Sequence, residues 1–312
     1  MISKISTNKN NFKRKFFFTK NARSGWSKII EHYKKDHPNG KILLPAYIGW
    51  SPNEGSGIFD SVINANISFD FYSLDKFLQI DFADFKSKVE IAGKPLILLV
   101  HYFGLVDTQY DQIVQWLKGE EQYFVEDCAH AMFTDLIGGK CGREGKFSLY
   151  SLHKLLPLDT GGILISNRNE KMVTEDYKMV NEKDAENKID EFNFGFDLWK
   201  IANKRRTNYS FLCDFLTNTN GITIIHPILK DGIYPQTLPI LIHSEKRDDL
   251  YFLLNKKGFG VVSLYHTMIK QLNGYTNEAV TYTSKHILNL PVHQDTGEKE
   301  LKELASLLKS SL

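Results

Sequence analysis

The stretch PLILLVHYFGLVDTQYDQIVQWLKGEEQYFVED, residues 95–127, holds the pattern that decides the fold. Two nearly all-apolar runs, 95–101 and 122–126, are expected to be strands, and the residues from Tyr110 to Lys118 are expected to form a helix between them. Apolar strands that alternate with helices are typical of a parallel sheet that is covered on both faces. The stretch therefore predicts an α/β protein with a mostly parallel central sheet.

The alternation of strands and helices continues on both sides of this stretch. Lys154 lies in a loop between two further strand-like runs, and the charged, weakly patterned residues 168–191 follow. We place a domain boundary there, which predicts a large domain over residues 1–195 and a smaller α+β domain over residues 196–312. The other expected elements are helices over 24–35, 197–216, 246–257 and 298–308 and strands over 41–44, 147–152, 162–166, 237–243 and 261–264.

The composition indicates a globular protein without a strong field of one charge. The 312 residues include 39 basic and 37 acidic side chains, so neither nucleic acid nor an acidic membrane is expected as a partner. The three cysteines match no disulfide framework, and free thiols are typical of a reducing compartment. The apolar run Pro95–Val100 is too short to span a membrane, and the basic segment Lys9–Lys20 lacks the features of a signal peptide. We therefore expect a soluble, cytoplasmic protein.

Asp127 and Lys154 occupy positions that favour a catalytic role. Asp127 ends an apolar strand, and ligands of open α/β sheets bind beyond the carboxyl ends of the strands. A carboxylate there can keep a heteroaromatic nitrogen protonated, although Asp127 can equally be the N-cap of a helix that begins at Cys128. A desolvated Lys154 can act as a nucleophile that forms a Schiff base, whereas most loop lysines are simply solvated.

Three other patterns carry less chemical information. His130 can be a ligand, an acid or base, or a structural residue held by hydrogen bonds. The run from Gly55 to Gly57 begins like a dinucleotide fingerprint, but a third glycine is missing and we set it aside. No histidines and cysteines stand at the spacing of a metal-binding motif, so no metal is expected in catalysis.

Four short blocks, taken in order, give the chain a resemblance to a known family. They are HYFG at 101–104, EDCAHA at 126–131, GGKCGREGK at 138–146 and SLHKLLPLDTGG at 151–162. Their order and spacing resemble the DegT/DnrJ/EryC1/StrS family of sugar aminotransferases that depend on pyridoxal 5'-phosphate (PLP). The segments ILLPAYIGWSP at 42–52 and ILNLPVHQD at 287–295 resemble the outer parts of that family. The resemblance implies the type I aminotransferase fold, with a small α+β C-terminal domain.

The resemblance also implies how the cofactor is held. Lys154 would carry PLP as a Schiff base, Asp127 would pair with its pyridine nitrogen, and His130 would contact its ring. Arg23 and Ser24 match the turn with which the family cradles the phosphate, and a helix N-terminus is a suitable site for an anion.

Two further parts of the site follow from the resemblance. Trp50 lies close to the family's ring-stacking aromatic residue, and its alternative role is that of a buried loop anchor. Family members are homodimers that share their active sites, and EFNFGF at 191–196 resembles the segment that reaches across, so Asn193 would touch the phosphate bound by the partner subunit. Gly195 stands where that segment has an arginine. An anionic group that the family's arginine binds must therefore be bound by another residue of this chain or by none.

The chain also departs from the family near the lysine. Leu149 stands where the family usually has a phosphate-binding serine, so Ser151 or Ser148 would take its place. Relatives that have a histidine instead of the lysine catalyse dehydration, and His153 directly precedes Lys154. The spacing to the following glycines favours Lys154 as the equivalent of the family's lysine.

Amino transfer is the activity that the resemblance implies. An amino acid, by family habit glutamate, would give its amino group to a keto sugar, expected to be a nucleotide-linked keto-deoxyhexose. Two alternatives stay open, namely a PLP-dependent sugar dehydratase or other lyase on the same fold, and a non-catalytic relative that binds a nucleotide sugar. The sequence specifies neither the sugar nor the nucleotide, and neither the position nor the stereochemistry of amination.

Overall fold

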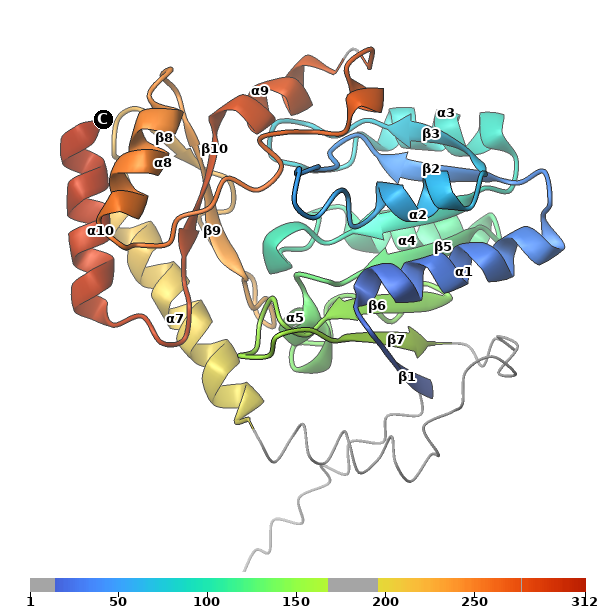
Figure 1. The fold of residues 1–312 in the computed structure, drawn as a ribbon, viewed down its shortest axis with the longest axis horizontal. Helices are drawn as coiled ribbons and strands as arrows, with labels where there is room; N and C mark the ends of the chain where they lie inside the picture. Colours follow the sequence, from blue (N-terminus) through green and yellow to red (C-terminus); the bar gives the residue numbers. More distant parts are fainter. Residues whose placement is uncertain (1–14, 168–195, 276) are drawn as a thin grey trace, which may run out of the picture.

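The large sheet is the centre of the molecule. In the computed structural model, which describes residues 15–167, 196–275 and 277–312, it has seven strands in the order β1-β7-β6-β5-β4-β2-β3 (Figure 1). The five strands from β3 to β6 run parallel, whereas β7 and β1 are antiparallel to their neighbours. The strands are β1 Lys15–Thr19, β2 Lys41–Pro45, β3 Ser68–Tyr72, β4 Leu96–Val100, β5 Tyr123–Asp127, β6 Phe147–Ser151 and β7 Gly162–Ser166.

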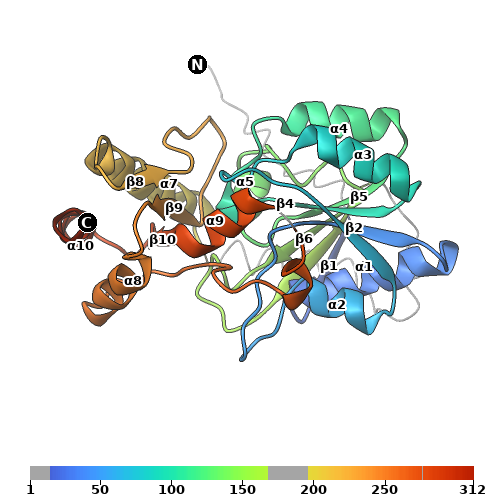
Figure 2. The ribbon, with the colours of Figure 1, turned by 90° about the horizontal axis from the view of Figure 1, so that it is seen from above.

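Helices cover both faces of this sheet. Figure 2 shows α3 and α4 on one face and α1 and α2 on the other. The side chains of β2 divide accordingly, because Ile42 and Leu44 pack with the α1 side and Leu43 packs with the α3 side. The sheet is therefore buried on both faces, as its apolar strands predicted. The helices are α1 Ala22–Asp36, α2 Phe59–Asn64, α3 Phe82–Ala92, α4 Tyr110–Gly119 and α5 Met132–Leu136, with the short 3-10 helix η1 at Tyr102–Gly104.

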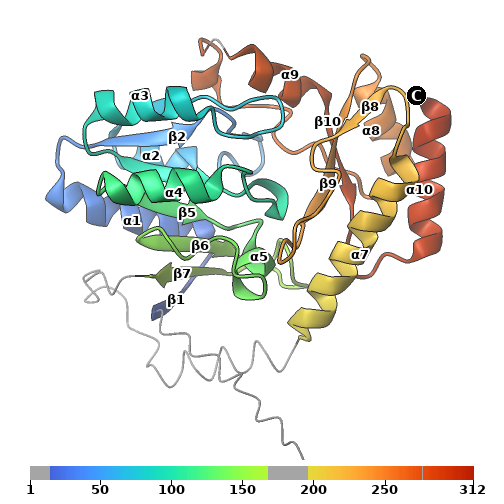
Figure 3. The same cartoon turned by 180° about the vertical axis from the view of Figure 1, so that it is seen from behind.

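A smaller antiparallel sheet of three strands, in the order β10-β9-β8, lies beside the large one. Figure 3 shows α7 and α10 on its outer side, and α5 between the two sheets near the ends of β5 and β6. The remaining elements of the chain are α7 Leu198–Leu216, β8 Ile222–Ile224, β9 Thr237–Ile242, α8 Arg247–Lys256, η2 Lys270–Leu272, α9 Glu278–His286, β10 Ile287–Pro291 and α10 Glu298–Ser311. Of these, η2 packs against the α1 side of the large sheet.

Most of the expected elements are confirmed, and one is wrong. The run 261–264 is not a strand, since it makes only an isolated bridge between Val262 and Asn289. The backbone turns on both sides of it, at Gly260 with φ of 66° and at Tyr265 with φ of 65°. The expected boundary after residue 195 borders residues 168–195, which lie outside the described part of the chain, so the division into domains stays a prediction.

No helix among the described residues has both the length and the apolar character that a membrane crossing requires.

Candidate active site

Asp127 is the last residue of β5, at the carboxyl edge of the parallel strands. Its carboxylate is 9% exposed, and Oδ1 accepts a hydrogen bond from the backbone N–H of Ala129 at 2.8 Å. The helix that follows, α5, begins only at Met132 and has no side-chain cap, so the N-cap role considered for Asp127 is wrong. Burial raises the pKa of Asp127, while the Ala129 N–H and the charges of Lys154 and His101 lower it.

Lys154 reaches the same place from the loop after β6. Its Nζ lies 2.8 Å from Nε2 of His130, and Nδ1 of His130 accepts a hydrogen bond from the backbone N–H of Phe103 at 3.2 Å. Because Nδ1 is an acceptor, a neutral imidazole must carry its proton on Nε2 and donate it to Lys154. Only an uncharged amine can accept that bond. The contact therefore favours the neutral amine of Lys154.

The electrostatic surroundings agree with this protonation state. Burial lowers the pKa of Lys154, and the charges of Asp127 and Glu54 only partly oppose it. Burial also lowers the pKa of His130 well below its ordinary value, and Lys154 lowers it further. Both shifts favour the uncharged forms of the two side chains, and the alternative of an ordinary solvated lysine does not fit this environment.

Aromatic rings enclose His130 on two sides. The ring of Phe103 lies 6.0 Å away at an interplanar angle of 12°, and the ring of Tyr265 lies 6.2 Å away at 18°. Tyr265 comes from the far end of the chain, and burial together with the Asp127 charge raises its pKa. The sequence analysis missed Tyr265, because only the folding of the C-terminal third against the large sheet brings it to the site.

Gly49 makes room for Tyr265. A Cβ at Gly49 would lie 1.9 Å from Cδ1 of Tyr265, so no larger residue fits without displacing the ring. The backbones run side by side here, since the N–H of Trp50 donates to the carbonyl of Thr267 at 3.0 Å. Trp50 itself is 45% exposed, which does not fit the alternative of a buried loop anchor.

The N-terminus of α1 lies against the loop that carries Lys154. Thr160 Oγ1 donates to the Lys20 carbonyl at 2.9 Å, and a Cβ at Gly162 would come within 2.4 Å of Asn21. Asn21 caps the helix, accepting hydrogen bonds from the backbone N–H of Ser24 at 2.9 Å and from its hydroxyl at 3.0 Å. The tertiary structure thus places the N-terminus of α1, with Ser24, beside the loop that carries Lys154.

The remaining expected residues differ in their surroundings. Arg23 donates to the Glu54 carbonyl at 2.6 Å and lies 3.5 Å from Asp60, so its guanidinium secures the loop between β2 and α2. Ser151 is buried at the end of β6, where its hydroxyl lies 3.4 Å from Nδ1 of His153, whereas Ser148 is held by the Gly142 carbonyl and by Asn167. Asn193 and Gly195 lie outside the described residues.

Several features of this site fit PLP. A neutral, partly buried amine can form an imine, a buried carboxylate can hold a proton on a ring nitrogen, and flat aromatic side chains can line a planar ring. The capped N-terminus of a 15-residue helix, α1, provides a positive dipole end for a phosphate. Lys154, Asp127 and His130 would hold the ring, with Ser24 and Ser151 near the phosphate.

The sequence match agrees with the geometry. Residues 62–192 match the model of the DegT/DnrJ/EryC1/StrS aminotransferase family. The expected resemblance is thus confirmed. Over these residues the chain is similar to the aminotransferases of that family. Among curated proteins, none matches the sequence.

Solved structures of this family share the fold. The chain is similar to Helicobacter pylori PseC, an aminotransferase involved in the biosynthesis of pseudoaminic acid, at a TM-score of 0.76 and 16% identity over 95% of this chain and 87% of that one. For a DegT DnrJ EryC1 StrS aminotransferase from Brucella abortus the TM-score is 0.74 and the identity is 16%, over 97% of this chain and 87% of that one. For the E. coli GDP-4-keto-6-deoxy-D-mannose-3-dehydratase with bound hydrated PLP the TM-score is 0.74 and the identity is 16%, over 96% of this chain and 89% of that one. The type I aminotransferase fold is confirmed.

Proposed function

We propose that this protein transfers an amino group from an amino acid, glutamate, to a keto sugar, and that the sugar is a nucleotide-linked keto-deoxyhexose. The observation that carries the proposal is the hydrogen bond between Lys154 and His130, which leaves the lysine uncharged beside the buried Asp127. Sugar-modifying enzymes among the structures of similar fold support a sugar as the acceptor.

Each side chain of the site has its own role in the proposed reaction. Bound PLP supplies an aldehyde carbon for attachment and a ring that withdraws electrons from the reacting carbon. Lys154 Nζ would hold the cofactor and, once released, would take a proton from the substrate carbon and return it as a general base and acid. Asp127 would keep the ring nitrogen protonated, and His130 would fix the position of the Lys154 amine.

The contacts of the phosphate and of the ring face extend this proposal. Ser24 and Ser151 would bind the phosphate at the N-terminus of α1, Arg23 would keep the neighbouring loop in place, and Trp50 would cover the ring. Asn193 would complete the phosphate site of the partner subunit in a homodimer with shared active sites.

The arrangement also favours transamination over dehydration. His153, the residue that would stand for the lysine in a dehydratase, is exposed, whereas the adjacent Lys154 makes the contact with His130. The location in the cytoplasm and the division into a PLP-binding domain over 1–195 and a small domain over 196–312 belong to the same proposal.

A spectroscopic experiment tests the proposed activity. The purified protein is incubated with PLP, treated with borohydride and digested, and the modified peptide is identified by mass spectrometry. We expect the cofactor on Lys154, and we expect Lys154→Ala to abolish the attachment while the matched variant Lys256→Ala, at an exposed position on α8, retains it.

The second part of the experiment tests amino transfer itself. Glutamate added to the unreduced protein should convert the lysine-bound form of the cofactor to pyridoxamine phosphate and release 2-oxoglutarate. Attachment to Lys154 without this conversion would favour the lyase or another amino donor. The absence of any attachment would refute a catalytic role.

A further inference from the structure

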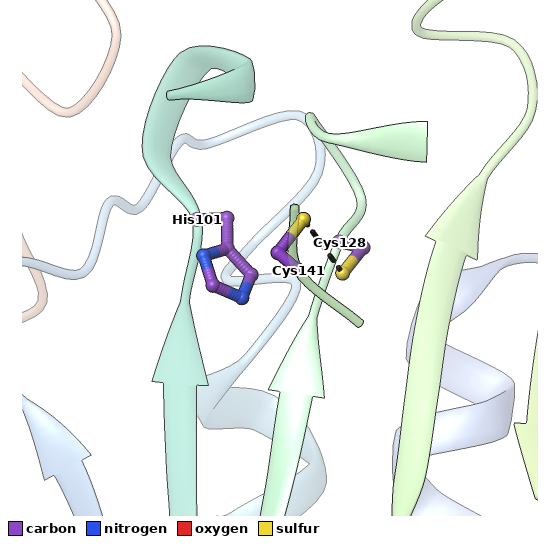
Figure 4. Close-up of side chains that lie close together, drawn as sticks. All are labelled: His101, Cys128 and Cys141. Atoms are coloured by element: carbon purple, nitrogen blue, oxygen red, sulfur yellow. Dashed lines mark hydrogen bonds between the residues drawn. The ribbon is translucent and has the colours of Figure 1, made fainter. Parts of the chain in front are cut away.

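Three side chains that are not part of the cofactor site gather behind Asp127. Cys128 Sγ lies 3.9 Å from Cys141 Sγ, and a ring nitrogen of His101 and both sulfurs lie within 4.8 Å of one another. Figure 4 shows the cluster, with the two sulfur atoms directed toward each other beside the imidazole. All three residues are buried, and they come from the ends of β4 and β5 and from the loop before β6.

The separation of the sulfurs suits a shared metal ion. Two thiolates at about 2.3 Å from one tetrahedral zinc ion lie roughly 3.8 Å apart, whereas a disulfide requires about 2.05 Å. Cysteine and histidine are the ligands that zinc prefers. We propose that His101, Cys128 and Cys141 supply three of the ligands of one zinc-class divalent ion, which the linear spacing of these residues did not indicate.

The loop that carries Cys141 is fixed independently of any ion. The carboxylate of Glu126 accepts hydrogen bonds from the backbone N–H groups of Gly142 at 2.6 Å and of Glu144 and Gly145 at 2.9 Å each. Gly142 has φ of 73°, and a Cβ there would lie 2.9 Å from Cys128 Sγ. The loop backbone is therefore pressed against the sulfur, which keeps both thiols in place for a ligand.

The same carboxylate orients the imidazole. Glu126 Oε2 lies 2.9 Å from Nε2 of His101 and accepts a hydrogen bond from the Tyr110 hydroxyl at 2.8 Å. A buried carboxylate beside a histidine is a common feature around metal ligands, where it fixes the ring and strengthens the site. His101 is thus held by a neighbour that does not depend on the cofactor.

Binding of the ion releases protons from all three ligands. A divalent ion displaces the thiol protons of Cys128 and Cys141 and the second ring proton of the charged His101, so three H⁺ leave, and the two thiolates neutralise the charge of the ion. Glu126 stays ionised and keeps the hydrogen bonds from the Tyr110 hydroxyl and from the loop backbone. His101 binds as a neutral imidazole. The ion would join the end of β5 to the loop before β6, and would thereby stiffen the backbone that positions Asp127. The site does not depend on the proposed amino transfer.

Cobalt substitution tests this site directly. The full chain is produced in medium with Co²⁺ in place of zinc, and its visible spectrum is recorded at the red end, where PLP does not absorb. We expect the bands of tetrahedral cobalt and thiolate-to-cobalt charge transfer, with about one ion per chain. Metal content of protein from zinc-supplemented medium is measured by mass spectrometry.

The third cysteine provides a matched control. Cys128→Ala and Cys141→Ala should each lose the cobalt bands and the bound zinc, whereas Cys213→Ala, a buried cysteine of α7, should keep both. If the variants misfold, the cobalt spectrum of the wild-type protein is by itself the test of the metal site. A wild-type protein without thiolate-to-cobalt absorption, or freshly purified protein in which Cys128 and Cys141 form a disulfide, overturns the proposal.

Discussion

Lys154 Nζ lies 2.8 Å from Nε2 of His130, and the backbone N–H of Phe103 occupies the other ring nitrogen. A main-chain hydrogen bond thus selects the tautomer of the histidine, and through it the protonation state of the lysine. This relationship depends on three segments of the chain, which the ends of β4, β5 and β6 bring together.

Replacing His130 by Phe should move the uptake of PLP to higher pH. The neutral amine of Lys154 is the reactive form, and its pKa is lowered by burial from the ordinary 10.5. Without the Nε2–H donor the neutral form loses stabilisation, so the pKa of Lys154 should rise, and the pH profile of cofactor uptake with it. The rate of cofactor uptake by the apo protein is measured across pH. His153→Phe, at the exposed neighbour, should leave the profile in place, and an unshifted His130→Phe profile would contradict the tautomer argument.

Asp127→Asn should abolish most of the activity while the fold is retained. The amide oxygen still accepts the hydrogen bond that Ala129 donates at 2.8 Å, but the negative charge that would hold a proton on the ring nitrogen is lost. We expect the turnover number to fall by at least about 10²-fold. Glutamate half-reaction rates and melting temperatures are compared with the wild type. Full activity in Asp127→Asn would remove this residue from the proposed mechanism.

Gly49→Ala should disturb the site through Tyr265. The new methyl group would lie 1.9 Å from the Tyr265 ring and push it away from His130, at a cost of about 1–3 kcal/mol in the free energy of unfolding. Gly57→Ala, in the same loop, is the control, because a Cβ there meets no atom within 4 Å. Denaturant unfolding and the Kd for PLP are measured for both. Equal effects of the two substitutions would show that the Tyr265 contact is unimportant.

Arg205→Ala should weaken the junction between the two sheets. Arg205 is 2% exposed, and its guanidinium donates to Gln294 Oε1 at 2.9 Å and to the Gln236 carbonyl at 3.0 Å. Burial lowers its pKa to about 10. Because buried acceptors would lose their donor, we expect a loss of about 3 kcal/mol in the free energy of unfolding. Arg206→Ala, whose side chain is 26% exposed, should cost less, and unfolding in urea measures both.

Much of the fold follows from local patterns that the sequence displays. The apolar runs at β4 and β5 and the helix between them, α4, need no partner to be recognised, because strand and helix periods are properties of neighbouring residues. The elements β1 and β10 were not predicted from their own residues. β1 is defined by its pairing with β7, and β10 by its pairing with β9, which lie far away in the chain.

The sequence by itself determined the large α/β sheet and the resemblance to a family, and it predicted Asp127 and Lys154 as site residues, since these depend on residue types in a fixed order. Only the tertiary structure decided that His130, and not solvent, contacts Lys154, and that Tyr265 lies beside His130 at the same site. It also decided that His101 lies beside Cys128 and Cys141. Such contacts join segments whose distance in space is set by packing, which the order of residues along the chain does not express.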